Sequence, residues 1–184
     1  MTLGLVFGTV RMADYDPEWK NFAAETIERL RPIFGANAVE FQHIGSTAIG
    51  GIKAKPVIDV AVGVHDFALT ETLSIEMEKA GYYVKHFPKK ADDADGFHWF
   101  IIYSDEFRTV MTHTVRVCQY LGRSWVNWIE FRDFLIANPA EAKLYEALKI
   151  ESANKFSEDN PSYSKSKDSF VAQRLRPSNA EPNK

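Results

Sequence analysis

The chain has 184 residues, of which 45% are hydrophobic and 26% are charged, a composition typical of a folded globular domain rather than a disordered one. Its formal net charge of −3 gives no overall attraction to nucleic acid or anionic membrane, so we expect neither as a partner. The start of the chain does not have a signal-peptide pattern and no apolar run approaches 18 residues, so we expect a cytoplasmic location. Cys118 is the single cysteine, which excludes an internal disulfide and a Cys-based zinc site and favours a buried structural thiol.

The first half of the chain predicts two helices around two strands. Asp16-Pro17-Glu18 has the composition of a helix start, and apolar residues at three- and four-residue steps extend this helix to Gly35. Strands are predicted at Ala38–Ile44 and at Pro56–Val64, the second almost entirely β-branched or small and therefore central. A helix over Thr70–Ala80 follows, with Leu73, Met77 and Ala80 facing inward and Gly81 ending it.

The second half predicts two strands and then three helices. Trp99–Tyr103 and Val110–Gln119 have strand composition. Helices are expected from about Ser124 to Leu135, from the capping box Asn138-Pro139-Ala140-Glu141, and from Asn160-Pro161 to Leu175.

This order predicts an α+β (α/β) fold, a mixed β-sheet backed by helices with a helical C-terminal cap. We expect one domain over residues 1–176, with the sheet core in 1–120 and the cap in 121–176, and a disordered tail over 177–184.

A turn and a carboxylate carry the main chemical signal. Gly45, Ser46 and Thr47 follow a strand, and their amides and hydroxyls at the start of a turn could bind an anion. Asp59 lies on the buried strand, where a carboxylate must be paired, protonated or metal-bound. An ordinary turn and a structural acid are the alternatives for each feature alone. Together, with Lys55 between them, they favour a phosphate site.

Arg116 is the second candidate. Thr112, Thr114, Arg116 and Cys118 alternate onto one face of a predicted strand. A cation on a sheet face either pairs with an internal acid such as Asp59 or points at an anionic ligand.

Several other polar or aromatic residues have structural interpretations. We expect His43 and His113 to be hydrogen-bonded structural histidines and Trp128 to be a packing residue. The acidic run Asp92–Asp95 is expected to be a solvated turn rather than a metal site.

Two segments carry a family resemblance. His43–Ile49 and Ala54–Val60 closely resemble the GrpB-like family of the nucleotidyltransferase superfamily. Tyr15–Trp19 and Phe131–Leu135 are also similar to that family, and the resemblance extends from about Val10 to Leu175.

The resemblance implies a polymerase-beta-like nucleotidyltransferase fold, in which a Gly-Ser turn binds nucleotide phosphates and strand acids hold Mg²⁺. It also implies that a lysine of the closing helices contacts the phosphates, with a solvated helix face as the alternative for any one of these lysines. The candidate ligand-binding residues are Gly45, Ser46, Thr47, Lys55, Arg116, Lys149, Tyr163 and Lys167, with Asp59 as candidate catalytic residue and metal ligand.

The sequence departs from the superfamily pattern at its acids. Ala61 stands where a second carboxylate would share the face of Asp59, and residues 110–119 contain no acid. Thr114 and Arg116 stand near the positions of the family's paired histidines. Three functions stay open: a magnesium-dependent transferase of nucleoside monophosphates, a module that binds a nucleotide or phosphorylated metabolite without catalysis, and an interaction domain with an unused cleft.

Overall fold

The computed structural model describes residues 3–70, 72–87 and 96–175; the predicted turn at Asp92–Asp95 and the predicted tail over 177–184 lie outside them. The strands are β1 (Leu5–Val6), β2 (Ala38–Ile44), β3 (Ile58–Val64), β4 (Tyr83–Phe87), β5 (Phe97–Tyr103) and β6 (Val110–Gln119). The α-helices are α1 (Glu18–Phe34), α2 (Leu73–Lys79), α3 (Arg123–Ala137), α4 (Pro139–Lys155), α5 (Asn160–Lys165) and α6 (Asp168–Arg174). Short 3₁₀ turns are η1 (Gly35–Asn37), η2 (Ser46–Ala48) and η3 (Phe67–Thr70).

The strands form one mixed sheet in the order β2-β3-β6-β5-β4, with β1 paired to β6. β3 and β6 run parallel, and the other neighbours are antiparallel. β3, which is apolar or small at every position except Asp59, lies between β2 and β6, as its composition predicts. The mixed sheet backed by helices confirms the predicted fold class.

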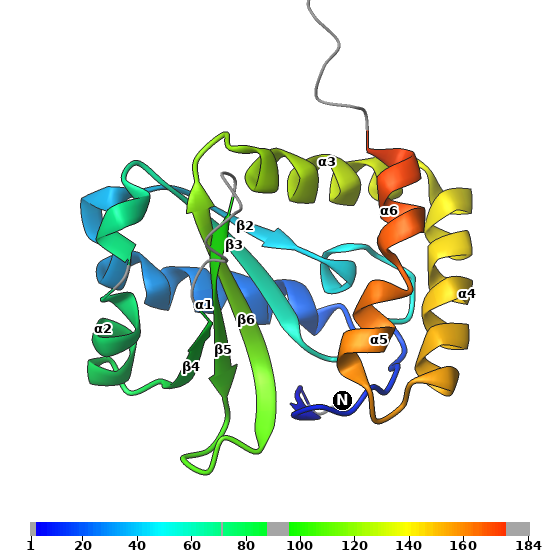
Figure 1. Cartoon of the computed structure of the whole chain (residues 1–184), viewed down its shortest axis with the longest axis horizontal. Helices are drawn as coiled ribbons and strands as arrows, with labels where there is room; N and C mark the ends of the chain where they lie inside the picture. Colours follow the sequence, from blue (N-terminus) through cyan, green and yellow to red (C-terminus); the bar gives the residue numbers. More distant parts are fainter. Residues whose placement is uncertain (1–2, 71, 88–95, 176–184) are drawn as a thin grey trace, which may run out of the picture.

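Helices cover both faces of the sheet (Figure 1). Trp19 and Leu30 of α1 and Met77 of α2 pack against Val60 of β3 in the largest core cluster. On the opposite face, Trp125 of α3 packs in a cluster with Ile44 of β2 and Ala61 of β3. Part of this second face is left for a cleft.

The C-terminal helices gather beside the sheet in Figure 1, with α4 in yellow and α5 and α6 in orange to red. Ala142 and Tyr145 of α4 pack against Ile49 and Ile52, which lie in the loop between β2 and β3. The cap is therefore fixed to the loop that carries the predicted turn and Lys55. None of the helices within the described ranges is long and apolar enough to cross a membrane.

Two predictions about the cap were wrong. α4 begins at Pro139 as expected, but the capping box does not form: the Asn138 side-chain amide donates to the Phe134 carbonyl at 2.7 Å, while Glu141 pairs with Arg174 at 2.6 Å. The predicted last helix is two helices, α5 and α6, and Asp159 caps α5 by accepting from the Ser162 amide at 3.1 Å.

Three details nearer the sheet also differ. α2 begins at Leu73, and Ala80 is exposed at its C-cap instead of facing inward. The strands β1 and β4 were not predicted. A register shift between β5 and β6 places Met111, rather than Thr112, in the cluster on the cleft face.

Candidate functional site: a cationic cleft

A cleft of about 530 Å³ opens between the second face of the sheet, the β2–β3 loop and the helices α3, α5 and α6. It brings together residues that are far apart in the sequence. The predicted site residues that line it are Gly45, Ser46, Thr47, Lys55, Asp59, Arg116, Tyr163 and Lys167.

Gly45 ends β2 and brings the turn against Asp59. Its φ of 71° lies in the region that favours glycine, and a Cβ at this position would collide with Asp59 Oδ2. Ser46 is hydrogen-bonded to the Tyr145 hydroxyl, and Thr47 Oγ1 lies 2.9 Å from His43 Nε2. Gly45 is thus required by the close approach of the turn to the carboxylate.

Asp59 lies on β3 directly beside Thr114 of β6. The Thr114 hydroxyl donates to Asp59 Oδ1, and Arg116 Nη2 lies 3.4 Å from the same oxygen. This confirms an Arg116–Asp59 ion pair, one of the two interpretations open from the sequence. The pair is long, and Arg116 Nε is buried without a hydrogen-bond partner in the described structure. Arg116 therefore retains unused donor capacity beside the cleft.

Lys55 and Lys167 face the same aromatic ring from different elements. Lys55 Nζ lies 5.2 Å and Lys167 Nζ 4.1 Å from the ring centre of Tyr163. Lys55 also donates to Asn160 Oδ1 at 2.8 Å. Burial lowers the pKa of both lysines, and for Lys167, where the charges of Lys55 and Arg116 add to the effect, the pKa falls to about 7. Positive charge is therefore crowded at this end of the cleft.

The fourth basic residue of the cleft lining, Arg132, is held by three hydrogen bonds within the protein. It donates to Gln42 Oε1 at 2.6 Å, to the His43 carbonyl at 2.8 Å and to Asp133 at 2.8 Å. Arg132 therefore ties α3 to β2 and its charge is paired with Asp133, so the cations less committed within the protein are the other three.

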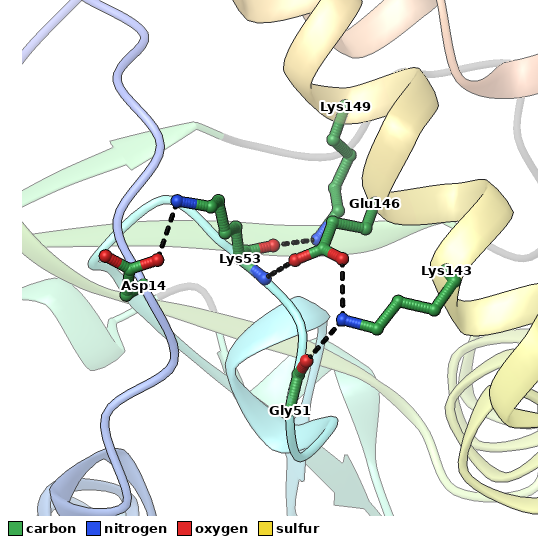
Figure 2. A network of polar contacts seen from close by, with 6 residues as sticks. All are labelled: Asp14, Gly51, Lys53, Lys143, Glu146 and Lys149. Carbon is green, nitrogen blue, oxygen red and sulfur yellow. Dashed lines mark hydrogen bonds and ion pairs between the residues drawn. The ribbon is translucent and has the colours of Figure 1, made fainter.

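Lys149 is placed differently from the other candidates. It is only 1% exposed, does not line the cleft, and donates to the Lys53 carbonyl. Figure 2 shows it within a network in which Glu146 accepts from the Lys53 amide and Lys143 donates to the Gly51 carbonyl. Burial, with the charge of Lys167, lowers the pKa of Lys149 to about 7. In this geometry Lys149 fixes α4 to the β2–β3 loop instead of reaching a ligand.

The histidines and the cysteine near the sheet have structural roles. His113 shares a 2.9 Å hydrogen bond with Thr112, and burial is the main cause that lowers the pKa of both His43 and His113 to about 4. Both rings are therefore neutral at pH 7. Cys118 is 2% exposed and burial raises its pKa to about 12, so the predicted buried thiol is confirmed.

Sequence reasoning missed the aromatic wall of the cleft. Trp99, Trp128, Phe131 and Tyr145 line it, and the Arg116 guanidinium lies 5.5 Å from the Trp128 ring centre. Trp128, expected to be a packing residue, is therefore also a wall of the cleft. Trp99 pairs with Arg116 across β5 and β6, a relation that helical spacing could not reveal.

The residues present do not fit a magnesium ion. Mg²⁺ requires several oxygen ligands, yet the described chain contains no cluster of three or more His, Cys, Asp or Glu side chains suited to a metal. Asp59 already accepts from Thr114 and Arg116, and its charge acts on Lys55 and Lys167. Cations around a single carboxylate repel a divalent cation and attract an anion.

The fold and site define a mixed α/β protein with a cationic, aromatic-lined cleft. The chain belongs to the GrpB family, because the family profile described as GrpB protein matches residues 9–176. The glutamate-rich protein GrpB of Alkalihalophilus pseudofirmus is 37% identical over 170 residues, which cover 92% of this chain and 95% of that protein.

Two other relatives extend the comparison. The crystal structure of the conserved protein GrpB from Enterococcus faecalis superposes with a TM-score of 0.74 at 26% identity, covering 89% of this chain and 93% of that one. A Mycobacterium bovis protein named dephospho-CoA kinase is 28% identical over 158 residues, or 77% of this chain and 39% of its own length.

Proposed function

We propose that this GrpB-family protein binds a phosphorylated small molecule, such as a nucleotide, in its cleft without a metal ion. The observation that carries the proposal is the convergence of Lys55, Arg116 and Lys167 on the cleft, with Arg116 incompletely hydrogen-bonded. A phosphate group offers several acceptor oxygens to the two ammonium groups and the guanidinium.

Two further observations support this ligand class. The aromatic side chains Trp99, Trp128 and Phe131 line the same cleft and offer an apolar surface for an organic group attached to the phosphate. The similarity to part of a protein named dephospho-CoA kinase is consistent with a phosphorylated small molecule as partner.

Magnesium-dependent transfer of a nucleoside monophosphate is the second candidate. The resemblance to nucleotidyltransferases and the position of Asp59 opposite Gly45 favour it. The one inner carboxylate, Asp59, and the cations around it favour binding without transfer.

Calorimetric titration tests the proposal. Each nucleoside mono- and triphosphate is titrated in EDTA and again in magnesium. We expect binding in EDTA, and we expect Arg116→Gln to weaken it by about 10- to 150-fold, because hydrogen bonds to charged groups contribute about 1.5–3 kcal/mol. Lys165→Met is the matched control, since Lys165 is exposed on α5 and does not line the cleft.

Three outcomes separate the candidates. Binding in EDTA that Arg116→Gln weakens and Lys165→Met leaves unchanged supports the proposal. Binding that requires magnesium supports the transferase. If no phosphorylated compound binds at millimolar concentration, the proposal is wrong.

A further inference from the structure

Asp59 is the acid at the centre of the cleft, and its contacts are unusual for a metal ligand. Oδ1 accepts from Thr114 and lies 3.4 Å from Arg116 Nη2, while Oδ2 lies against the backbone of Gly45. Its side chain is 22% exposed, so it is accessible from the cleft yet held by neighbours on several sides.

The charge of Asp59 also reaches residues that it does not touch. It raises the pKa values of Lys55 and Lys167, opposing the burial that lowers both. Asp168, the second acid of the cleft lining, is exposed at the start of α6. Asp59 is therefore the inner negative charge that balances the cation cluster.

Counting charges gives the class of ligand that the site balances. Three cations, Lys55, Arg116 and Lys167, less one for Asp59, leave two positive charges once a bound anion raises the lowered pKa of Lys167 and keeps both lysines protonated. A phosphate monoester carries about −1.5 to −2 at pH 7 and balances this surplus. A triphosphate carries more negative charge than the cluster can balance without a metal.

We propose that Asp59 is an internal counterion that sets the charge of the ligand, so that the cleft selects a phosphomonoester over a triphosphate. This inference rests on the proposed function and assigns Asp59 a role opposite to metal binding. A metal ligand strengthens binding of polyphosphates, whereas an internal counterion weakens it.

The test uses three inorganic anions that differ in charge and carry no organic group: orthophosphate, pyrophosphate and tripolyphosphate. Each is titrated calorimetrically in EDTA into the full chain and into Asp59→Asn, which keeps the size of the side chain. We expect Asp59→Asn to bind orthophosphate about tenfold more tightly and tripolyphosphate more strongly still, because each added ligand charge was repelled by the carboxylate.

Glu151→Gln is the matched control. Glu151 is exposed on α4 and does not line the cleft, so the variant removes one negative charge from the same protein without altering the site. We expect its affinities to stay within about twofold of the wild type, since exposed charges at a distance are screened by salt.

The wild type supplies a second measurement that needs no variant. If Asp59 is a counterion, adding magnesium leaves tripolyphosphate binding unchanged or weaker, because the metal removes free polyanion from solution. Tighter tripolyphosphate binding in magnesium would overturn the inference, as would weaker orthophosphate binding by a folded Asp59→Asn. Those results leave the proposed function intact. If neither the wild type nor Asp59→Asn binds any of the three anions and no nucleotide binds either, both the proposed function and the inference about Asp59 are wrong.

Discussion

Replacing Lys149 with Met tests whether the buried ammonium sets how stability depends on pH. Lys149 is 1% exposed, and its pKa is lowered from 10.5 to about 7 by burial and by the charge of Lys167. The unfolded chain therefore holds this proton up to about pH 10.5, while the folded protein releases it near pH 7. Because the unfolded state binds more protons between these values, the free energy of unfolding increases with pH across this window.

The magnitude follows from the same shift. Each pKa unit corresponds to about 1.36 kcal/mol, and from pH 7 to 8.5 one such lysine adds roughly 1.5 kcal/mol to the free energy of unfolding. Lys149→Met keeps an unbranched side chain of similar size and removes the titrating group. We expect the free energy of unfolding of the variant to rise by roughly 1.5 kcal/mol less than that of the wild type over this pH range. Losing the hydrogen bond to the Lys53 carbonyl changes stability at every pH and does not affect this comparison.

The assay is urea unfolding at pH 7.0, 7.5, 8.0 and 8.5 for wild type, Lys149→Met and Lys155→Met. Lys155 lies on the same helix and is exposed, so its variant should follow the wild-type slope. Equal slopes for wild type and Lys149→Met would refute the reasoning, because the lysine would then titrate alike in the folded and unfolded states.

Three further predictions concern the cleft and the sheet. Gly45→Ala should destabilise the protein by about 1–3 kcal/mol in urea unfolding, more than Gly51→Ala, since both have positive φ but only Gly45 would collide with Asp59; equal losses would show that the collision relaxes. Cys118 should react with a thiol reagent at pH 8 only as the protein unfolds, because its pKa is about 12 and it is buried, and rapid labelling of the native protein would contradict this. Sulfate, whose charge is constant, should bind up to about tenfold more weakly per pH unit above pH 7, because an anion beside Lys167 raises the pKa of this lysine and the complex retains a proton that the free protein loses. In Lys167→Met the sulfate affinity should not change with pH. A wild-type affinity that is equally independent of pH would exclude this coupling.

The interior strands β3 and β6 could be predicted from the sequence because their composition reports burial directly. The boundaries of β6 agree with the prediction, and β3 begins two residues later than expected. The boundaries of β2, an edge strand, agree as well. The edge strand β4, Tyr83–Phe87, carries Lys85 and His86 and lacks a clear apolar alternation, so its pairing with β5 decides its structure.

Tertiary contacts overrode local signals in the cap. Asn138 and Glu141 have capping-box spacing, but Glu141 pairs with Arg174, which is 33 residues away. No local pattern contains that partner.

The part of the candidate site carried by strands and their connecting loop was predictable from local patterns, whereas for the helices only the family resemblance supplied candidates, and two of those three line the cleft. Gly45, Lys55, Asp59 and Arg116 line the cleft because sheet geometry places them on one side. Lys149 was expected to reach a phosphate, yet its ammonium turns to a backbone carbonyl. Which way a long side chain turns depends on acceptors supplied by the rest of the fold.

The network of Figure 2 has a consequence for the order in which the protein folds. The three bonds from α4 to Gly51 and Lys53 span 92 to 96 residues of sequence. Contacts of such separation are slow to form, because a long loop must close before any of them is gained. The β2–β3 loop can therefore take its final shape only after α4 has docked. A chain still emerging from the ribosome would have its sheet strands before it had a cleft, so ligand could stabilise only the completed protein.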